Sequence, residues 1–323
     1  MIEIKISDEN SGQRIDKLLA EILPKEHDVK ITRSQIQKLI TEESIKLNGE
    51  IFNSSHKTKT GDLITVEETK RKEREITPVV KKLKLNIEEI IVKETKDYIV
   101  INKPAGIIVH DFENVSEETL VDVLLMRYPE IRQIGEDPSR PGIVHRIDRE
   151  VSGLMVVARN QKTFDNLKEQ FKKRTVQKYY KALVYGVVSK EHDEIRFPIA
   201  RSKSRYKMAA LPETKKGEKQ DEGKIAISEF DVVERKINYT LLRVKIKTGR
   251  THQIRVHLSA YGNPIVGDNV YTTNKLREKN IKKNLGRIFL VAFFLSFNDL
   301  DGNRQEFEVD IPNNLKEFLK TAK

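Results

Sequence analysis

The sequence predicts an α+β protein in which a small N-terminal α+β domain is linked to a larger domain built on a mainly antiparallel sheet with flanking helices and loops. The chain has 323 residues, enough for two domains of ordinary size. Residues 69–87 are charged and lack an apolar period, so they divide the chain. After residue 88 strand-type segments outnumber helical ones and no glycine-rich phosphate loop occurs, which favours antiparallel sheet over a doubly wound parallel fold.

Residues 1–68 predict two helices and a few short strands. The first helix is indicated by apolar residues at the helical spacing i, i+3, i+4 and i+7, namely Ile15, Leu18, Leu19 and Ile22. Thr32 and Gln35 form a candidate capping box ahead of a second helix. Asn48-Gly49 predicts a tight hairpin turn, and Gly61-Asp62 predicts another turn before the strand Leu63–Val66. We therefore expect a compact domain here.

In the larger domain the expected strands are Tyr98–Ile101, Ile107–Val109, Leu154–Ala158, Tyr179–Tyr185, Ala226–Phe230 and Leu241–Ile246. Along the last of these, apolar and basic residues alternate, so one face should be buried and the other solvated. Helices are expected at Gln161–Arg174 and Thr251–Tyr261.

The chain is basic. Sixty Lys and Arg against 49 Asp and Glu give a formal charge of +11 and a pI of about 9.4, which favours polyanionic partners and nucleic acid first. Two stretches that we interpret as basic loops, residues 201–224 and 272–287, hold most of the excess. Contact with phosphates and plain solvation both remain open for them.

Several classes are excluded or disfavoured. No cysteine occurs, which rules out disulfides, thiolate nucleophiles and sulfur-ligated metals. The histidines are too scattered for a metal site, so we expect no metal. The opening MIEIKISDEN lacks the regions of a secretory signal, and the longest apolar run, Ile288–Leu295, is too short for a membrane helix. We expect a cytoplasmic protein with no membrane partner.

The densest candidate for chemistry is the string PGIVHRIDREVSGL. Asp148 lies there in a turn before a strand, flanked by Arg146 and Arg149, whose charges favour an ionised carboxylate. Such a group can act as a nucleophile or an electrostatic stabiliser, although an aspartate between arginines is more often a structural ion pair. Glu150, two residues further, leaves a paired-carboxylate glycosidase site open.

A second string, TGRTHQIRVHL, follows a strand and predicts a helix that opens at Thr251. Ile254 and Leu258 lie on one face of that helix, whereas His252 and Arg255 share another. Arg255 is therefore expected to be free to reach a site.

Four separated motifs carry a family resemblance over roughly residues 88–315. They are HRIDREVSGLMVVARN, the preceding NKPAGIIVH, the later KYYKAL and TGRTHQIRVHLSAYGNPIVGD, and together they resemble the RluA/RluD-type pseudouridine synthase family. The N-terminal RIDKLL, TRSQIQKLI and IKLNG resemble the alpha-L RNA-binding module of ribosomal small-subunit protein four. The resemblance implies an RNA-binding domain at 1–68, a linker at 69–87 and a catalytic domain at 88–323. The C-terminal segment departs from the family pattern at Leu290-Val291-Ala292.

The resemblance also assigns roles to individual residues. It implies that Asp148 is the catalytic nucleophile toward the target uridine, at either the ribose C1′ or the base, that Arg255 pairs with it, and that Tyr180 stacks on the base and takes part in proton transfer. It implies that Arg146 fills the gap left by a flipped base. The remaining candidates lie within the matching motifs: Arg250, His252 and Gln253 for substrate binding, and Arg14, Asp16, Arg33, Lys38 and Asn48 for RNA binding.

We therefore expect an isomerase that converts uridine to pseudouridine in structured RNA, with large-subunit ribosomal RNA as the foremost substrate. The reaction needs the base to leave its stack, be held while detached and be rejoined through carbon. No cofactor and no obligate protein partner is implied. Two alternatives stay open: a non-catalytic RNA-binding or ribosome-assembly protein on the same fold, and a carboxylate-dependent nucleoside hydrolase that releases free uracil.

Overall fold

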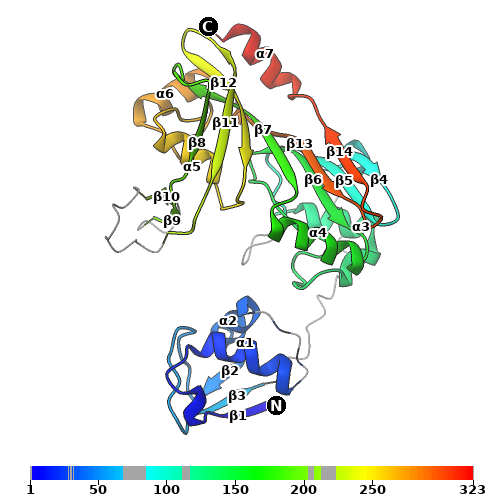
Figure 1. Ribbon diagram of the computed structural model, residues 1–323, viewed down its shortest axis with the longest axis vertical. Helices are drawn as coiled ribbons and strands as arrows, with labels where there is room; N and C mark the ends of the chain where they lie inside the picture. Colours follow the sequence, from blue (N-terminus) through cyan, green and yellow to red (C-terminus); the bar gives the residue numbers. More distant parts are fainter. Residues whose placement is uncertain are drawn as a thin grey trace. The chain divides into compact units, whose positions relative to one another are not determined.

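The structure is a computed structural model that describes residues 2–27, 29, 31, 33–67, 85–110, 117–202, 207–211 and 223–322, without the side chains of Ser34 and Lys38. The chain forms two compact units, residues 1–82 and 83–323 (Figure 1). Each unit has its own hydrophobic core. Of the predicted linker 69–87, only the last three residues are described. Among these, Ile87 is buried in the core of the larger unit.

The N-terminal unit packs two helices against a three-stranded sheet. Its elements are β1 (Ile2–Lys5), α1 (Ile15–Glu26), α2 (Arg33–Thr41), β2 (Ile45–Leu47) and β3 (Leu63–Val66). The strand order is β1-β3-β2 and both pairings are antiparallel. The predicted apolar stripe of α1 is buried in the core. Thr32 of the predicted capping box lies outside the described residues.

A tight turn forms at Asn48-Gly49 as predicted. Both residues have positive φ, 53° and 82°, which is the left-handed conformation that this turn requires. The Asn48 side chain also links this turn to the next one: its Oδ1 accepts from the Leu63 backbone N–H and its Nδ2 donates to Asp62.

The larger unit is built on a nine-stranded sheet with a separate two-stranded sheet beside it. The nine strands are β4 (Ile91–Glu94), β5 (Tyr98–Lys103), β6 (Ser152–Ala158), β7 (Gln177–Tyr185), β8 (His192–Ile195), β11 (Ser228–Arg235), β12 (Tyr239–Ile246), β13 (Leu290–Asn298) and β14 (Arg304–Glu308). The small sheet pairs β9 (Ile199–Arg201) with β10 (Met208–Ala210).

The strand order is β4-β5-β6-β13-β7-β12-β11-β8, with β14 paired to β13. All pairings are antiparallel except β6 with β13, which run parallel for two residue pairs, so the prediction of a mainly antiparallel sheet is confirmed. Gly153 makes this parallel contact possible. Its φ is +130° and a Cβ would lie 2.2 Å from the carbonyl oxygen of Ala292. β6 therefore joins β13 just after the turn that carries Asp148.

Five helices flank the sheet in the described part of this unit: α3 (Leu120–Arg127), α4 (Gln161–Lys173), α5 (Gln253–Ala260), α6 (Asn274–Lys283) and α7 (Asn313–Thr321). α4 packs against β6 and β13, whereas α5 packs against β11 (Figure 1). α4 begins at the Asn160 cap and ends at Arg174, which adopts the left-handed conformation. In the described residues no helix is long and apolar enough to span a membrane.

Three local predictions are wrong. Residues 107–109 form no strand but only an isolated bridge from Ile108 to Thr119. The stretch 272–287 is not a loop, because Thr273 caps a helix, α6, that occupies most of it. α5 begins at Gln253 and not at Thr251, because His252 has a φ of +56° and so stands outside the helix. Most of the predicted basic loop 201–224 lies outside the described residues.

Candidate active site

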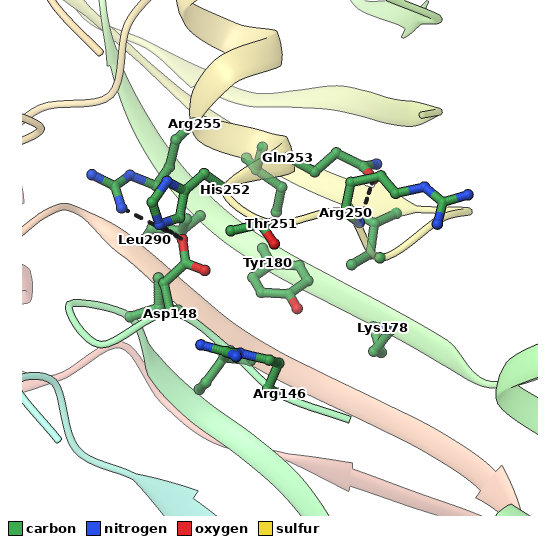
Figure 2. A pocket seen from close by; sticks show the side chains of 15 residues that line it. Arg146, Asp148, Lys178, Tyr180, Arg250, Thr251, His252, Gln253, Arg255 and Leu290 are labelled. Atoms are coloured by element: carbon green, nitrogen blue, oxygen red, sulfur yellow. Dashed lines mark hydrogen bonds and ion pairs between the residues drawn. The ribbon is translucent and has the colours of Figure 1, made fainter. Parts of the chain in front are cut away.

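A cavity of about 90 Å³ opens at the centre of the larger unit (Figure 2). It lies where the turn before β6, the strands β7 and β12, and the loop into α5 converge. Its lining residues are Arg146, Ile147, Asp148, Val151, Lys178, Tyr180, Ile246, Gly249, Arg250, Thr251, His252, Gln253, Ile254, Arg255 and Leu290. All seven catalytic and substrate-binding residues predicted from the sequence are in this set.

The Asp148 turn is anchored from behind. The carbonyl of Asp148 accepts from the Val151 N–H, and the carbonyl of Arg149 accepts from the Gly106 N–H. Lys103, which is fully buried, donates to that same Arg149 carbonyl and to those of Pro104 and Ile107. Burial, together with the charge of Arg287, lowers the pKa of Lys103 to about 7. The buried lysine thus ties the turn after β5 to the turn that presents Asp148.

Arg255 is the centre of an ion-pair network and not a freely reaching side chain. It is 3% exposed, and its Nε and Nη2 donate to the two oxygens of Asp268 at 2.7 and 3.1 Å. Its Nη1 lies 3.5 Å from Asp148 Oδ2 and 3.6 Å from Glu150 Oε2. Burial alone would lower the pKa of Arg255, but the hydrogen bonds and charge of Asp268, together with the charges of Asp148 and Glu150, raise it overall. Arg255 is thereby fixed with one nitrogen directed at Asp148.

Asp268 itself is held by the backbone. Its Oδ1 accepts from the N–H groups of Val270 and Tyr271 at 2.8 and 3.0 Å, and its side chain is 1% exposed. Burial acts to raise the pKa of Asp268, but the Arg255 guanidinium and these N–H groups lower it overall. The Asp268 carboxylate therefore stays charged, and it compensates the positive charge of Arg255 from the side away from the cavity.

The loop into α5 places two further polar residues at the cavity. Gln253 reaches back so that its Oε1 accepts from the Thr248 hydroxyl and the Arg250 backbone N–H. His252 Nδ1 lies 2.7 Å from the Tyr271 hydroxyl, and its Nε2 lies 4.0 Å from Asp148 Oδ2. Burial lowers the pKa of His252, which favours the neutral ring. Gln253 thus shapes the loop, whereas His252 borders Asp148.

Tyr180 forms the cavity floor beside Asp148 (Figure 2). It is 5% exposed, and burial together with the Asp148 charge raises its pKa above the ordinary value, so the phenol is neutral. Within the described residues its hydroxyl has no hydrogen-bond partner. Tyr179 points to the opposite face of β7, where its ring meets Phe294 edge to face. The strand therefore directs only the second tyrosine of KYYKAL into the cavity.

The arginines that flank Asp148 in the sequence diverge. Arg149 pairs with Glu117 at 2.8 Å and donates to the Gly106 carbonyl, so it does not neutralise Asp148 as its position suggested. Arg146 lines the cavity and its Nη1 lies 3.3 Å from His110 Nε2. Arg255, far away in the sequence, takes the place expected of Arg149.

Sequence reasoning missed three contributors to the site, Lys103, Lys178 and Asp268. Each lies within one of the family motifs: Lys103 in NKPAG, Lys178 in KYYKAL and Asp268 at the end of NPIVGD. A polar residue inside an apolar strand or directly after a turn glycine was the available signal.

The N-terminal unit holds a second charged cluster. Asp16 is completely buried and accepts from Arg14, Arg33 and Gln37, with Nη2 distances of 3.0 and 2.9 Å for the two arginines. Burial opposes the charge of Asp16, yet these donors lower its pKa. Both arginines remain about half exposed, at 44% and 48%. Lys38 belongs to α2, but its side chain lies outside the described part.

The fold and site define a class: an enzyme with a small cavity on a mainly antiparallel sheet, lined by the carboxylate of Asp148, the buried Arg255 and Tyr180. Among the described residues no group of three His, Cys, Asp or Glu side chains could hold a metal ion.

Comparison with known proteins gives the family. The family model described as RNA pseudouridylate synthase matches residues 97–260. An uncharacterized RNA pseudouridine synthase of Aquifex aeolicus is 35% identical over 98% of this chain and 95% of its own length. The ribosomal large subunit pseudouridine synthase D of Haemophilus influenzae is 31% identical over 100% of this chain and 95% of its own. A solved structure, human RNA pseudouridylate synthase domain containing 4, aligns with a TM-score of 0.59 and 25% identity over 72% of this chain and 93% of that one.

The chain therefore belongs to the RNA pseudouridylate synthase family, and it is an RNA pseudouridine synthase, an isomerase that acts on RNA. This confirms the resemblance of the larger domain and favours the enzyme over the non-catalytic alternative. The matched segment includes Asp148, Tyr180 and Arg255 and ends before Asp268.

Proposed function

We propose that this synthase converts uridine to pseudouridine in large-subunit ribosomal RNA and that Asp148 is its nucleophile. The observation that carries the proposal is the position of Asp148: its carboxylate faces the cavity at 3.5 Å from a guanidinium nitrogen of the buried Arg255. Two relatives over most of the chain, from Haemophilus influenzae and Pseudomonas aeruginosa, carry the name ribosomal large subunit pseudouridine synthase D. This supports the substrate and a cytoplasmic location.

The reaction is an isomerisation in which atoms and electrons balance internally. The bond between uracil N1 and ribose C1′ breaks, a bond between C5 and C1′ forms, C5 loses its proton and N1 ends with one. Asp148 attacks either the ribose C1′ or the base, and it leaves again when the base has been rejoined. Arg255 holds the carboxylate in place and compensates its charge, which preorganises the nucleophile before the RNA enters.

The other lining residues hold the uridine. Tyr180 offers its ring as a stacking platform for the flipped base, and its neutral hydroxyl can take part in proton transfer as a donor. Arg146 lies at the cavity edge, where it can fill the gap that the flipped base leaves. Arg250 and His252 line the cavity beside the loop into α5 and supply polar contacts to the bound nucleotide, whereas Gln253 holds that loop in shape.

We also propose that residues 1–68 form an RNA-binding domain of the alpha-L type. Its two arginines, Arg14 and Arg33, converge on the buried Asp16 and keep donors exposed, which suits contact with phosphates. Asp16 then acts by positioning and not by touching RNA. Lys38 and Asn48 stay candidates for RNA contact.

The decisive test is product mapping on an unmodified ribosomal RNA transcript by carbodiimide-dependent reverse-transcription stops, with Asp148→Asn as the control. Stops with the wild type alone are expected and would name the target uridines. RNA binding of Asp148→Asn should stay near that of the wild type. Turnover of this variant close to wild type would overturn the assignment of Asp148, and release of free uracil would indicate a hydrolase instead.

A paired comparison separates catalysis from RNA affinity. Arg255→Ala should lose turnover because Asp148 loses its partner, whereas Lys279→Ala, an exposed change on α6, should only reduce the salt dependence of binding. Equal losses of turnover in the two variants would contradict this division of roles.

A further inference from the structure

Lys178 is a cationic residue of the cavity that the proposed chemistry leaves unused. It lies on β7 two residues before Tyr180, so the two side chains share a face of the strand about 7 Å apart along it. In Figure 2, Lys178 and Asp148 lie on opposite sides of the Tyr180 ring. Lys178 and Tyr180 thus line the same cavity from one face of β7.

Among the described residues, no carboxylate forms an ion pair with Lys178. Its Nζ lies 5.0 Å from the centre of the Phe171 ring, and a Cβ built on Gly249 would lie 4.0 Å from it. Within the described ranges it has neither a hydrogen bond nor an ion pair. Burial lowers the pKa of Lys178 to about 8, and no carboxylate opposes this effect. A partly buried ammonium without an anion is costly unless a ligand supplies one.

The charges of the cavity are distributed unevenly. Four lining side chains are cationic, Arg146, Lys178, Arg250 and Arg255, and only Asp148 is a carboxylate. Asp148 and the carboxylates behind it compensate Arg255, whereas Arg250 donates its Nε to the Ile225 carbonyl and has no ion pair in the described part of the chain. The end of the cavity at Lys178 and Arg250 is therefore the end that attracts an anion.

We propose that Lys178 binds the phosphodiester adjoining the uridine that enters the cavity, so that this end of the site holds the backbone while Asp148 acts on the nucleoside. The inference rests on the proposed role of the Asp148 cavity. In an RNA substrate the phosphodiester is the anion, whereas uracil is neutral. Gly249, which also lines the cavity, places no side chain beside the amine.

The test compares Lys178→Met and Lys178→Arg with Lys181→Met as the matched control. Lys181 lies on the same strand, faces the other side and also packs its amine on an aromatic ring, 4.8 Å from the centre of Phe293. The probe is a mixture of unmodified ribosomal and transfer RNA transcripts, with binding measured from about 50 to 200 mM salt. Single-turnover pseudouridine formation is followed on the same RNA.

We expect Lys178→Met to raise the RNA concentration at half-saturation about tenfold, as for the loss of one charged hydrogen bond. The rate at saturating RNA should change less. Its salt slope should fall by about 0.7 to 0.9, the value for one phosphate contact. Lys178→Arg should keep the slope, and Lys181→Met should match the wild type. An unchanged slope with a lost rate would mean contact with the neutral base, and equal effects of the two methionine variants would mean general electrostatics; either result overturns the proposal.

A pH series adds a readout that a purely structural lysine would not move. A phosphate raises the pKa of Lys178 in the complex, so its contribution to affinity is complete below about pH 8 and is lost as the pH rises through the bound value. Around Lys178, burial lowers the pKa of His145 and keeps its ring neutral, and Arg146 and Arg250 are further cationic side chains that line the cavity. Lys178→Arg should remove this alkaline loss; a loss that persists in the arginine variant counts against the proposal.

A different result is expected if ribosomal RNA is not the substrate. The wild type would then place pseudouridine only in the transfer RNA of the mixture, and the Lys178 comparisons would be judged on that RNA. A wild type that binds RNA normally but forms no pseudouridine in either RNA would instead contradict the proposed role of Asp148 as nucleophile.

Discussion

The sharpest test of the site is a change behind it, Asp268→Asn. The replacement has the same shape and removes one negative charge that is 1% exposed. The side-chain amide of this variant would have one acceptor oxygen and one NH₂ group in place of the two carboxylate oxygens. If that oxygen takes the Oδ1 position, it still accepts from Val270, Tyr271 and Arg255 Nη2, but the NH₂ then faces the Arg255 Nε–H at 2.7 Å. Two donors cannot share that distance, so Arg255 must move.

The magnitudes follow from this geometry. Removing one partner of a buried pair costs about 3 kcal/mol, which for a domain of this size lowers the Tm by roughly 6–12 °C. A guanidinium displaced by about 1 Å from Asp148 should lower the single-turnover rate about 100-fold. RNA affinity should stay near that of the wild type, because a carboxylate this deeply buried cannot touch RNA.

The matched control is Asp231→Asn. Asp231 also binds one arginine through Nε and Nη2, at 3.2 and 2.9 Å to Arg243, but both side chains are about half exposed. Surface pairs contribute about 0–1 kcal/mol, so stability and rate should hardly change. Calorimetry and single-turnover assays on both variants decide the matter. A rate for Asp268→Asn within twofold of the control would refute the claim that Asp268 positions Arg255.

Three further outcomes are expected. Burial lowers the pKa of Lys103 to about 7, against about 10.4 in the unfolded chain, so above pH 7 the unfolded state binds one more proton than the folded state. The free energy of unfolding should therefore rise from pH 7 to 9 by about 2 kcal/mol more in the wild type than in Lys103→Met. Urea melts that change in parallel for the two proteins would contradict this. Gly153→Ala should cost about 4 kcal/mol or more because its Cβ meets the Ala292 carbonyl, whereas Gly302→Ala, also at positive φ but in open space, should cost only about 1 kcal/mol in urea melts. Asp16→Asn should lower RNA affinity in a binding titration about as much as replacing both arginines that it holds, and wild-type affinity would rule out its positioning role.

Sequence patterns predicted what local periodicity and local chemistry determine. The apolar stripe of α1 and the Asn48-Gly49 turn depend on residues a few positions apart, and the structure contains both. Along β12 the predicted alternation of buried and exposed residues is clear only from Leu242 to Val244. The convergence of Asp148, Tyr180 and Arg255 on one cavity came instead from the family motifs. Nothing in their spacing shows that β7 lies between the turn before β6 and the helix after β12.

The errors about the site residues have one physical origin, since each concerns a partner chosen by the fold and not by the neighbouring sequence. Arg149 stands beside Asp148 in the chain but pairs with Glu117, because the Gly106 and Lys103 contacts turn its carbonyl and side chain away from the cavity.

Arg255 was expected to be free because its helix face is polar, yet a free guanidinium at 3% exposure would be an uncompensated buried charge. The fold therefore has to supply a second carboxylate, and it does so from the turn after Gly267, thirteen residues along the chain. At Lys178 the described residues supply none, which is why the same reasoning that explains Asp268 assigns the missing anion there to the RNA.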